Sequence, residues 1–311
     1  MKAGVIAMVL ALAGVIASLW LLESTAPTLA FWALVVAVTI ASWIGLEWLA
    51  GIDKPRWIGA ILVPGLFGLL LLYLWQVLTV GFDVPPILLP SPARIGHQLV
   101  TNLDLEWQDF RQTFLKSVLA GFVLGSGLGF IVAILVDRSP FLQRGLLPLG
   151  ALVSAIPVVG IAPIMVMWFG FDWESKAAVI VIMTFFPMLV NTLAGLASAS
   201  GIERDLMHSY AAGYGQTLAK LRLPSALPFV FNALKINSTL ALIGGIVAEF
   251  FGTPVVGMGF RISVEIGRMN VDMVWATIAV AALAGSVFYG ILALIERGFT
   301  FWHPSYRQER S

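Results

Sequence analysis

The chain has few side chains that could perform enzyme chemistry. Its three histidines, His97, His208 and His303, lie far apart and form neither a paired metal-ligand motif nor part of a catalytic triad. No Lys follows a Gly, so the phosphate-binding loop G-x-x-x-x-G-K-[ST] is absent, and no Cys is present. We therefore expect a protein that is not an enzyme and that binds no cofactor or metal.

Two charged residues stand within one long apolar segment. Lys235 and Glu249 are separated by about 21 Å along a helix, so they cannot pair with each other inside it. A Lys has a stem long enough to reach the membrane surface, whereas Glu is short. We expect Lys235 to extend toward the surface and Glu249 to line a pathway or gate.

Proline and glycine interrupt other apolar segments. Pro157 and Pro163 flank Gly160, and Pro187 precedes Asn191 by one helical turn. A broken helix in lipid must lie against protein or a water-filled cavity. Residues 154–163 could therefore line a transport pathway or form a kink packed against other helices. The predicted pathway residues are Pro157, Gly160, Pro163, Asn191 and Glu249, although bonding to another helix is the default role for Asn191.

Residues 201–224 form a polar segment between two apolar ones. Leu206, Tyr210, Tyr214 and Leu218 recur at every fourth position, as on one face of a helix. Gly213 and Gly215 weaken a continuous helix, so two short helices with a bend are favoured. Pro224 is then expected to begin the next helix. The apolar face could float among lipid head groups or dock into a groove of a partner.

The composition determines the class of protein that must hold these residues. Hydrophobic residues make up 59% of 311 and charged residues 11%, which indicates an all-α, polytopic membrane protein with lipid around it. A net charge of +1 gives no indication of nucleic-acid binding.

Segments of about 20 apolar residues predict the membrane spans. Eight such segments occur, at about residues 3–22, 28–50, 58–80, 113–136, 146–169, 176–198, 226–251 and 274–295. The short loops are more basic on one side if both termini are cytoplasmic. The connection 81–112 contains an amphipathic stretch that we expect at the outer surface, and Gly121, Gly125 and Gly129 share a helix face suited to close packing.

Several motifs, in order along the chain, resemble those of one family. Residues 216–228, QTLAKLRLPSALP, are similar to the second half of the "EAA" cytoplasmic loop of ABC importer permeases of the nitrate, sulfonate and taurine group. Further similar motifs are Leu89-Pro90-Ser91-Pro92, Gly121 with Gly129, Pro157 with Pro163, Trp168-Phe169-Gly170, Phe186-Pro187, Asn191-Thr192, Gly195, Ala248-Glu249 and Gly257-Met258-Gly259. The resemblance covers about residues 60–300.

The first half of the loop departs from the family pattern. Asp205, Met207 and Ala211 stand where the family usually has Glu, Ala and Gly. This variant is similar to the branch for riboflavin or for a pyrimidine precursor of thiamine. The resemblance therefore leaves open a vitamin, a vitamin precursor or a sulfonate- or nitrate-type anion as the substrate.

The resemblance implies a type I ABC importer permease core at residues 58–300, two additional N-terminal helices at 1–57 and a cytoplasmic tail at 301–311. It further implies ATPase subunits that bind ATP and Mg, an extracytoplasmic substrate-binding protein, and a second permease that is either a copy or a paralogue. The location would be the cytoplasmic (inner) membrane of a bacterium or archaeon. The implied ATPase-coupling residues are Asp205, Leu206, Met207, Tyr210, Ala211, Gly213, Tyr214, Leu218, Leu223 and Pro224.

The alternative from another class is an ion-coupled secondary transporter, which would use charged groups near the membrane midplane and usually contains inverted repeats. Lys235 and Glu249 are few and lie toward the ends of their segment. A membrane anchor without transport would not explain the broken helices.

Overall fold

The computed structural model describes residues 2–24, 27–51, 56–154, 156–252 and 255–300. These residues are helical or lie in turns and connections, and they include no strand. Contacts divide the chain into two units, residues 1–101 with 269–276 and residues 102–268 with 277–311. The predicted tail at 301–311 lies outside the described residues.

The first unit contains the first three predicted spans, α1 (Lys2–Ser24), α2 (Leu29–Gly51) and α3 (Arg56–Gly81). The side chains of α2 and α3 form its core, namely Phe31, Val35, Val38, Leu70, Tyr73 and Val77. Inside this apolar packing the Ser18 and Tyr73 hydroxyls hydrogen-bond to each other at 2.8 Å. The expected amphipathic stretch forms the helix α4 (Pro92–Thr101), where Arg94 pairs with Asp272 at 2.7 Å.

The second unit begins with one continuous helical stretch, which is longer than the predicted span at 113–136. It consists of α5 (Leu103–Phe110), the π-helix η1 (Arg111–Val118) and α6 (Leu119–Asp137). The spans α9 (Trp173–Ala197), α12 (Leu223–Glu249) and α14 (Val271–Phe299) follow at the predicted places. Among the described residues, seven helical stretches are long and apolar enough to cross a membrane.

The fifth predicted span is not one continuous helix. Residues 146–169 belong to two shorter helices, α7 (Pro140–Ser154) and α8 (Val158–Phe169). Pro157 precedes α8 with an extended backbone. The predicted interruption of this span is therefore confirmed. Its position has a physical reason, since a proline can stand at the start of a helix without costing a backbone hydrogen bond.

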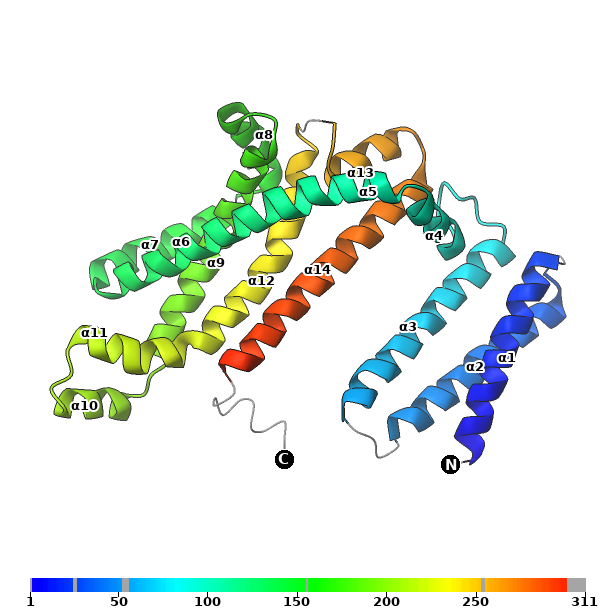
Figure 1. Ribbon diagram of the computed structural model, residues 1–311, viewed down its shortest axis with the longest axis horizontal. Helices are drawn as coiled ribbons and strands as arrows, with labels where there is room; N and C mark the ends of the chain where they lie inside the picture. The colour runs from blue at the N-terminus through cyan, green and yellow to red at the C-terminus, as the bar shows by residue number, and fades with distance from the viewer. Residues whose placement is uncertain (1, 25–26, 52–55, 155, 253–254, 301–311) are drawn as a thin grey trace. The chain divides into compact units, whose positions relative to one another are not determined.

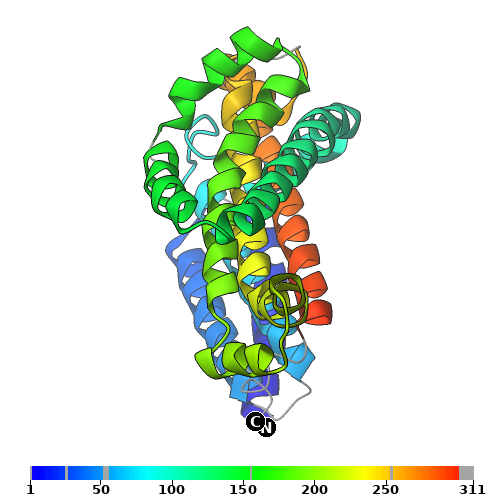
Figure 2. The same ribbon diagram turned by 90° about the vertical axis from the view of Figure 1, so that its left-hand side faces the viewer.

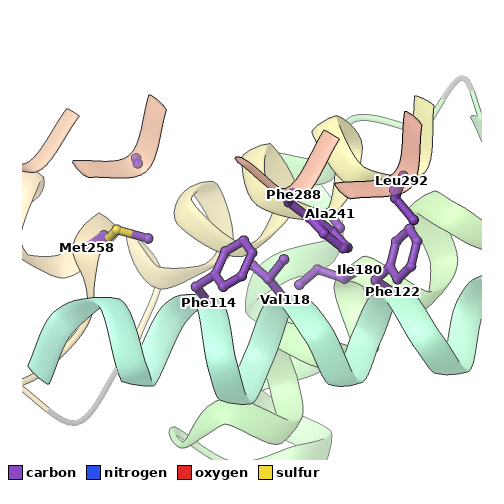
Figure 3. Packing of buried hydrophobic residues seen from close by; sticks show 9 residues of the cluster. Phe114, Val118, Phe122, Ile180, Ala241, Met258, Phe288 and Leu292 are labelled. Atoms are coloured by element: carbon purple, nitrogen blue, oxygen red, sulfur yellow. The ribbon is translucent and has the colours of Figure 1, made fainter. Parts of the chain in front are cut away.

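The three glycines of α6 pack against α9. A Cβ atom added to Gly121 would lie 2.6 Å from Ile180, and one added to Gly125 would lie 2.9 Å from the Cα of Val181. Only a residue without a side chain allows this approach of the two helices. Beside this contact Phe114, Val118, Phe122, Ile180 and Phe288 form part of an apolar core (Figure 3).

The irregular segments of the second unit lie at its two ends (Figures 1 and 2). Helices α8 and α13 (Met258–Gly267) lie at one end. Helices α10 (Gly201–Ser209) and α11 (Tyr214–Thr217) lie at the opposite end. The predicted coupling residues and most of the predicted pathway residues are thus at opposite ends of the spans.

Candidate functional site

Helix α10 is a short helix with a well-formed N-terminus. The Ser200 hydroxyl accepts a hydrogen bond from the Glu203 amide at 3.2 Å, and the Ser200 amide donates to the Glu203 carboxylate at 2.9 Å. This reciprocal capping box satisfies donors that a helix N-terminus leaves unpaired. The bonds from the Ser200 amide and hydroxyl lower the pKa of the Glu203 carboxyl below its ordinary value of 4.5.

The outer face of α10 carries apolar side chains that no other part of the described chain covers. Ile202 is 83% exposed, Leu206 55% and Tyr210 78%, and they follow one another at every fourth position. No residue of α10 is buried. Asp205 is also exposed, whereas Met207 is half-buried. Of the predicted apolar stripe, Leu206 and Tyr210 are thus exposed, whereas Tyr214 and Leu218 lie beyond α10 and are half-buried.

The bend after α10 is formed by Ala211. Its φ of 54° is in the left-handed region, which an alanine enters only at an energetic cost. The Ala212 amide donates to the Met207 carbonyl at 3.0 Å, and the Ala211 amide donates to the His208 carbonyl at 2.9 Å. This is the hydrogen-bond pattern that ends a helix with a left-handed residue, usually Gly. This left-handed residue gives a physical reason for the Gly that the resemblance leads us to expect where this chain has Ala211.

The second half of the segment, in contrast, packs against the rest of the unit. The Tyr214 hydroxyl donates to Asp137 Oδ2 at 2.9 Å, and the guanidinium of Arg138 lies 4.3 Å from the centre of the Tyr214 ring. Arg222 binds both oxygens of Asp137, at 2.7 and 2.8 Å, and donates to the Leu196 carbonyl at 2.9 Å. These bonds join the segment to the ends of α6 and α9.

The remaining predicted coupling residues lie along this anchored part. Gly213 precedes α11, and its amide donates to Gln216 at 3.2 Å. Leu218 begins the π-helical turn η2 (Leu218–Arg222), and Leu223 and Pro224 begin α12. Leu218, Leu223 and Pro224 are half-buried. The predicted coupling residues thus lie in one segment that has an exposed part and an anchored part.

The predicted pathway residues Pro157, Gly160 and Pro163 lie on or beside α8. An apolar hollow of about 610 Å³ lies between α8 and α9, and its lining residues include Gly160, Ile164, Trp168, Phe185 and Phe186. Gly160 has open space where a Cβ atom would stand. The break in the helix therefore borders an open apolar surface of this unit.

Glu249 is buried and fully hydrogen-bonded. Thr113 donates to its Oε1 at 2.7 Å and the Gly259 amide donates to its Oε2 at 2.7 Å. Gly257 has a φ of 140°, and a Cβ atom there would lie 2.7 Å from the Glu249 carboxyl. This contact gives a physical reason for the Gly257-Met258-Gly259 motif, because a side chain at the first glycine would displace the carboxylate.

A second buried carboxylate at the same end was not predicted from the sequence. Asp109 accepts a hydrogen bond from the Gly257 amide at 2.7 Å and forms an ion pair with Arg261 at 2.8 Å. Both partners are more than 140 residues away in sequence, so no local pattern indicates the pairing. Asp109 stands in a polar segment with Asp104 and Glu106, so its residue type alone did not single it out.

Two other predictions are corrected by these contacts. The Asn191 side chain donates to the Pro187 carbonyl of its own helix at 2.8 Å, rather than to another helix. Lys235 forms an ion pair with Glu296 of α14 at 2.7 Å, so it pairs within the unit and does not simply extend to the surface. Glu249 lies near Lys176 at the start of α9, about 22 Å along that helix from Asn191.

Comparisons with known proteins agree with this architecture. Residues 125–301 match the family described as "Binding-protein-dependent transport system inner membrane component". A probable ABC transporter permease of Haemophilus influenzae is 32% identical over 78% of this chain and 98% of its own length.

Two further relatives carry names that include a transported compound. The formylaminopyrimidine transport permease ThiX of Halalkalibacterium halodurans is 33% identical over 78% of this chain and 96% of its own length. The riboflavin transport system permease RibX of Chloroflexus aurantiacus is 32% identical over 76% of this chain and 88% of its own length. The chain therefore belongs to the family of binding-protein-dependent transport system inner membrane components and is a multi-pass membrane permease subunit of an ABC transporter.

Proposed function

We propose that this permease belongs to an ATP-driven importer and that α10 is the element by which a separate ATPase drives it. The observation that carries the proposal is the exposed apolar row of Ile202, Leu206 and Tyr210 on a capped helix of a loop between two spans. A helix presenting apolar residues at this spacing fits a hydrophobic groove of a partner. The binding sites for ATP and Mg would lie on that ATPase.

The anchored half of the segment would transmit the movement. Asp137 joins α6 to Arg222, and Tyr214 adds a second bond to the same carboxylate. A displacement of α10 would therefore pull on the ends of α6 and α12 together. The ATPase shifts the permease between inward-facing and outward-facing states if it contacts α10 differently in each.

The pathway would lie beside the broken helix. The hollow bordered by Gly160 and Trp168 is open on one side, and we propose that a second permease, either a copy or a paralogue, completes it. Pro157 precedes α8, and Pro163 lies inside it, where it removes one backbone hydrogen bond. Asn191 would lie along the same pathway, while Glu249 would hold the outer end of α12 against α13 near it.

The substrate would be a small organic solute delivered by an extracytoplasmic binding protein. Relatives named for riboflavin and formylaminopyrimidine transport support a vitamin or vitamin precursor. A sulfonate- or nitrate-type anion is the other substrate class that the family resemblance gives.

Reconstituted transport tests this proposal. The purified permease in liposomes should take up riboflavin or the pyrimidine only when the cognate ATPase, the binding protein and ATP are all present. Uptake by the permease alone, driven by an ion gradient, would instead identify a secondary transporter.

We further propose that both termini and α10 are cytoplasmic, since the basic loops then fall on one side. The chain has no Cys, so a single cysteine can be introduced at Thr101, Asp172 or His208 and labelled in intact cells. An impermeant reagent should label Thr101→Cys and Asp172→Cys. Labelling of His208→Cys from outside would contradict the orientation.

A further inference from the structure

The start of α13 is held by side chains of other helices. Three successive backbone amides, those of residues 257–259, each donate a hydrogen bond of 2.7 Å to a different side chain. The acceptors, in the same order, are Asp109 of α5, Thr113 of η1 and Glu249 of α12. All three side chains are buried. We call these three side chains together with residues 257–259 the α13 clasp.

The bonds of the α13 clasp depend on one another. The Thr113 hydroxyl that accepts from the Met258 amide also donates to Glu249 Oε1 at 2.7 Å. Asp109 also pairs with Arg261 of α13 itself, at 2.8 Å. Breaking one bond therefore moves groups that hold the others, and a buried donor or acceptor without a partner is costly. The three amides are thus expected to be released together rather than one by one.

The clasp includes part of a π-helix, which its own sequence does not require. Such helices are rare and are frequently found at functional sites. The sequence of η1, RQTFLKSV, has no proline or glycine and contains several good α-helix formers. Its contacts with distant segments are the bonds of Thr113 in the clasp and that of Gln112 to Asp172 at the start of α9, at 2.6 Å. These tertiary contacts hold the irregular register, and their loss would let the turn return to the α register.

Helix α12 connects the clasp with the opposite end of the unit. It runs from Leu223 to Glu249 as one helix. At its first end the adjoining Arg222 is bonded to Asp137, and at its last end Glu249 is part of the clasp. A continuous helix can carry a displacement from one end to the other. A movement of the first end of α12 would therefore shift Glu249 relative to Thr113.

We propose that the α13 clasp is a two-state device that opens as one unit and that α12 operates it. In the closed state it fixes α13 to the ends of α5, η1 and α12. A shift of Glu249 releases all three amides, and α13 is then free to move. The role of α12 rests on the function proposed for α10, whereas the opening of the clasp as one unit does not.

Hydrogen exchange of the three amides tests the unit behaviour in the full-length permease in nanodiscs. Thr113→Val removes the hydroxyl and keeps the shape of the side chain. We expect the amides of Gly257 and Gly259, which other side chains bind, to exchange roughly tenfold faster, the effect of one lost hydrogen bond to a charged group. Thr113→Ser retains a hydroxyl and should restore slow exchange. Faster exchange of the Met258 amide alone would mean three independent bonds and would overturn the proposal.

Two glycines of the same region provide a matched pair of variants. A Cβ atom at Gly257 would lie 2.7 Å from the Glu249 carboxyl, whereas one at Gly267, at the other end of α13, would have nothing within 4 Å. Gly257→Ala should speed exchange of the Met258 amide, which Thr113 holds, as well as that of Gly259. Gly267→Ala should leave both unchanged. This pair gives the test even if Thr113→Val does not fold, and unchanged Met258 exchange in Gly257→Ala would overturn the proposal.

The complex with the ATPase tests the role of α12. Exchange is compared between the ATP-free complex and the complex trapped with ATP and vanadate. All three amides should differ by the same factor, at least about fivefold, as for a coupling between two sites. Equal exchange in the two states of an active complex would overturn the role of α12 and leave the function of α10 standing. A permease that binds no ATPase would overturn both.

Discussion

At the scale of single residues, the chain places its charges in pairs that sequence reasoning did not anticipate. Glu249 was predicted to line a gate, because it has a short side chain and stands in an apolar segment. Its hydrogen-bond partners, Thr113 and Gly259, lie on other helices. Glu296, the partner of Lys235, is likewise on a different helix. The sequence singled out Glu249 and Lys235 but not Asp109. It could not supply their roles, because these arise where distant segments pack together.

Ala211 gives a prediction about the bend after α10. Ala211→Gly removes the strain of holding an alanine at a left-handed φ and should stabilise the bend by about 1 kcal/mol. The Ala212 amide should then exchange its hydrogen roughly fivefold more slowly. Ala212, which does not have a positive φ, provides the control. Ala212→Gly should speed exchange of the bend instead, and faster exchange in Ala211→Gly would mean that the bend has another conformation.

Glu203 gives a prediction about pH. Its pKa is lowered in the folded chain, so the capping contribution is present above the unfolded-state pKa of about 4.5 and is lost as the pH falls through the folded-state value. A spin label at His208→Cys should therefore become more mobile below about pH 4.5. In a Glu203→Gln background the mobility should not depend on pH in this range. The same pH response in both proteins would exclude Glu203 as the titrating group.

At the scale of elements, the length and hydropathy of the segments predicted most of the spans, since lipid requires every backbone group to bond within a helix. The two-part form of residues 201–224 was also predicted, but its bend lies at Ala211, and Gly215 belongs to the second helix. The π-helix η1 could not be predicted, because its sequence, RQTFLKSV, carries no proline or glycine. Its buried Thr113 bonds both Glu249 and the Met258 amide, so tertiary contacts accompany the irregular turn.

The packing of α6 on α9 gives a prediction with an internal control. Gly125→Ala places a Cβ atom against Val181 and Thr184, and we expect it to destabilise the permease by about 1–3 kcal/mol through overpacking. Gly127 is on the same helix and has nothing within 4 Å of an added Cβ. Gly127→Ala should therefore leave the midpoint of thermal unfolding in detergent nearly unchanged. A similar loss in both variants would show that the effect comes from the helix itself and not from its contact.

At the scale of the whole molecule, the motifs with a close physical cause were the ones that identified the family. Pro157 precedes a helix, and Gly257 leaves room for the Glu249 carboxylate. The substrate could not be predicted in this way, because the lining residues of the apolar hollow beside α8 include no charged side chain and offer only the indole N–H of Trp168 as a conventional hydrogen-bond donor. The first unit adds helices to the part of the chain that the family match covers.

The central claim is that α10 couples the permease to its ATPase, and co-purification tests it most directly. Leu206→Arg places a charge in the exposed apolar row, while His208→Arg places the same charge elsewhere on the exposed surface of α10. Leu206 is a better test position than Ala211, where arginine would also add backbone strain. Both variants should insert and unfold like the wild type, because neither side chain is buried.

We expect Leu206→Arg to lose the ATPase on purification and to lose uptake, and His208→Arg to keep both. If Leu206→Arg retained the ATPase at the wild-type level with uptake intact, α10 would not be the docking surface.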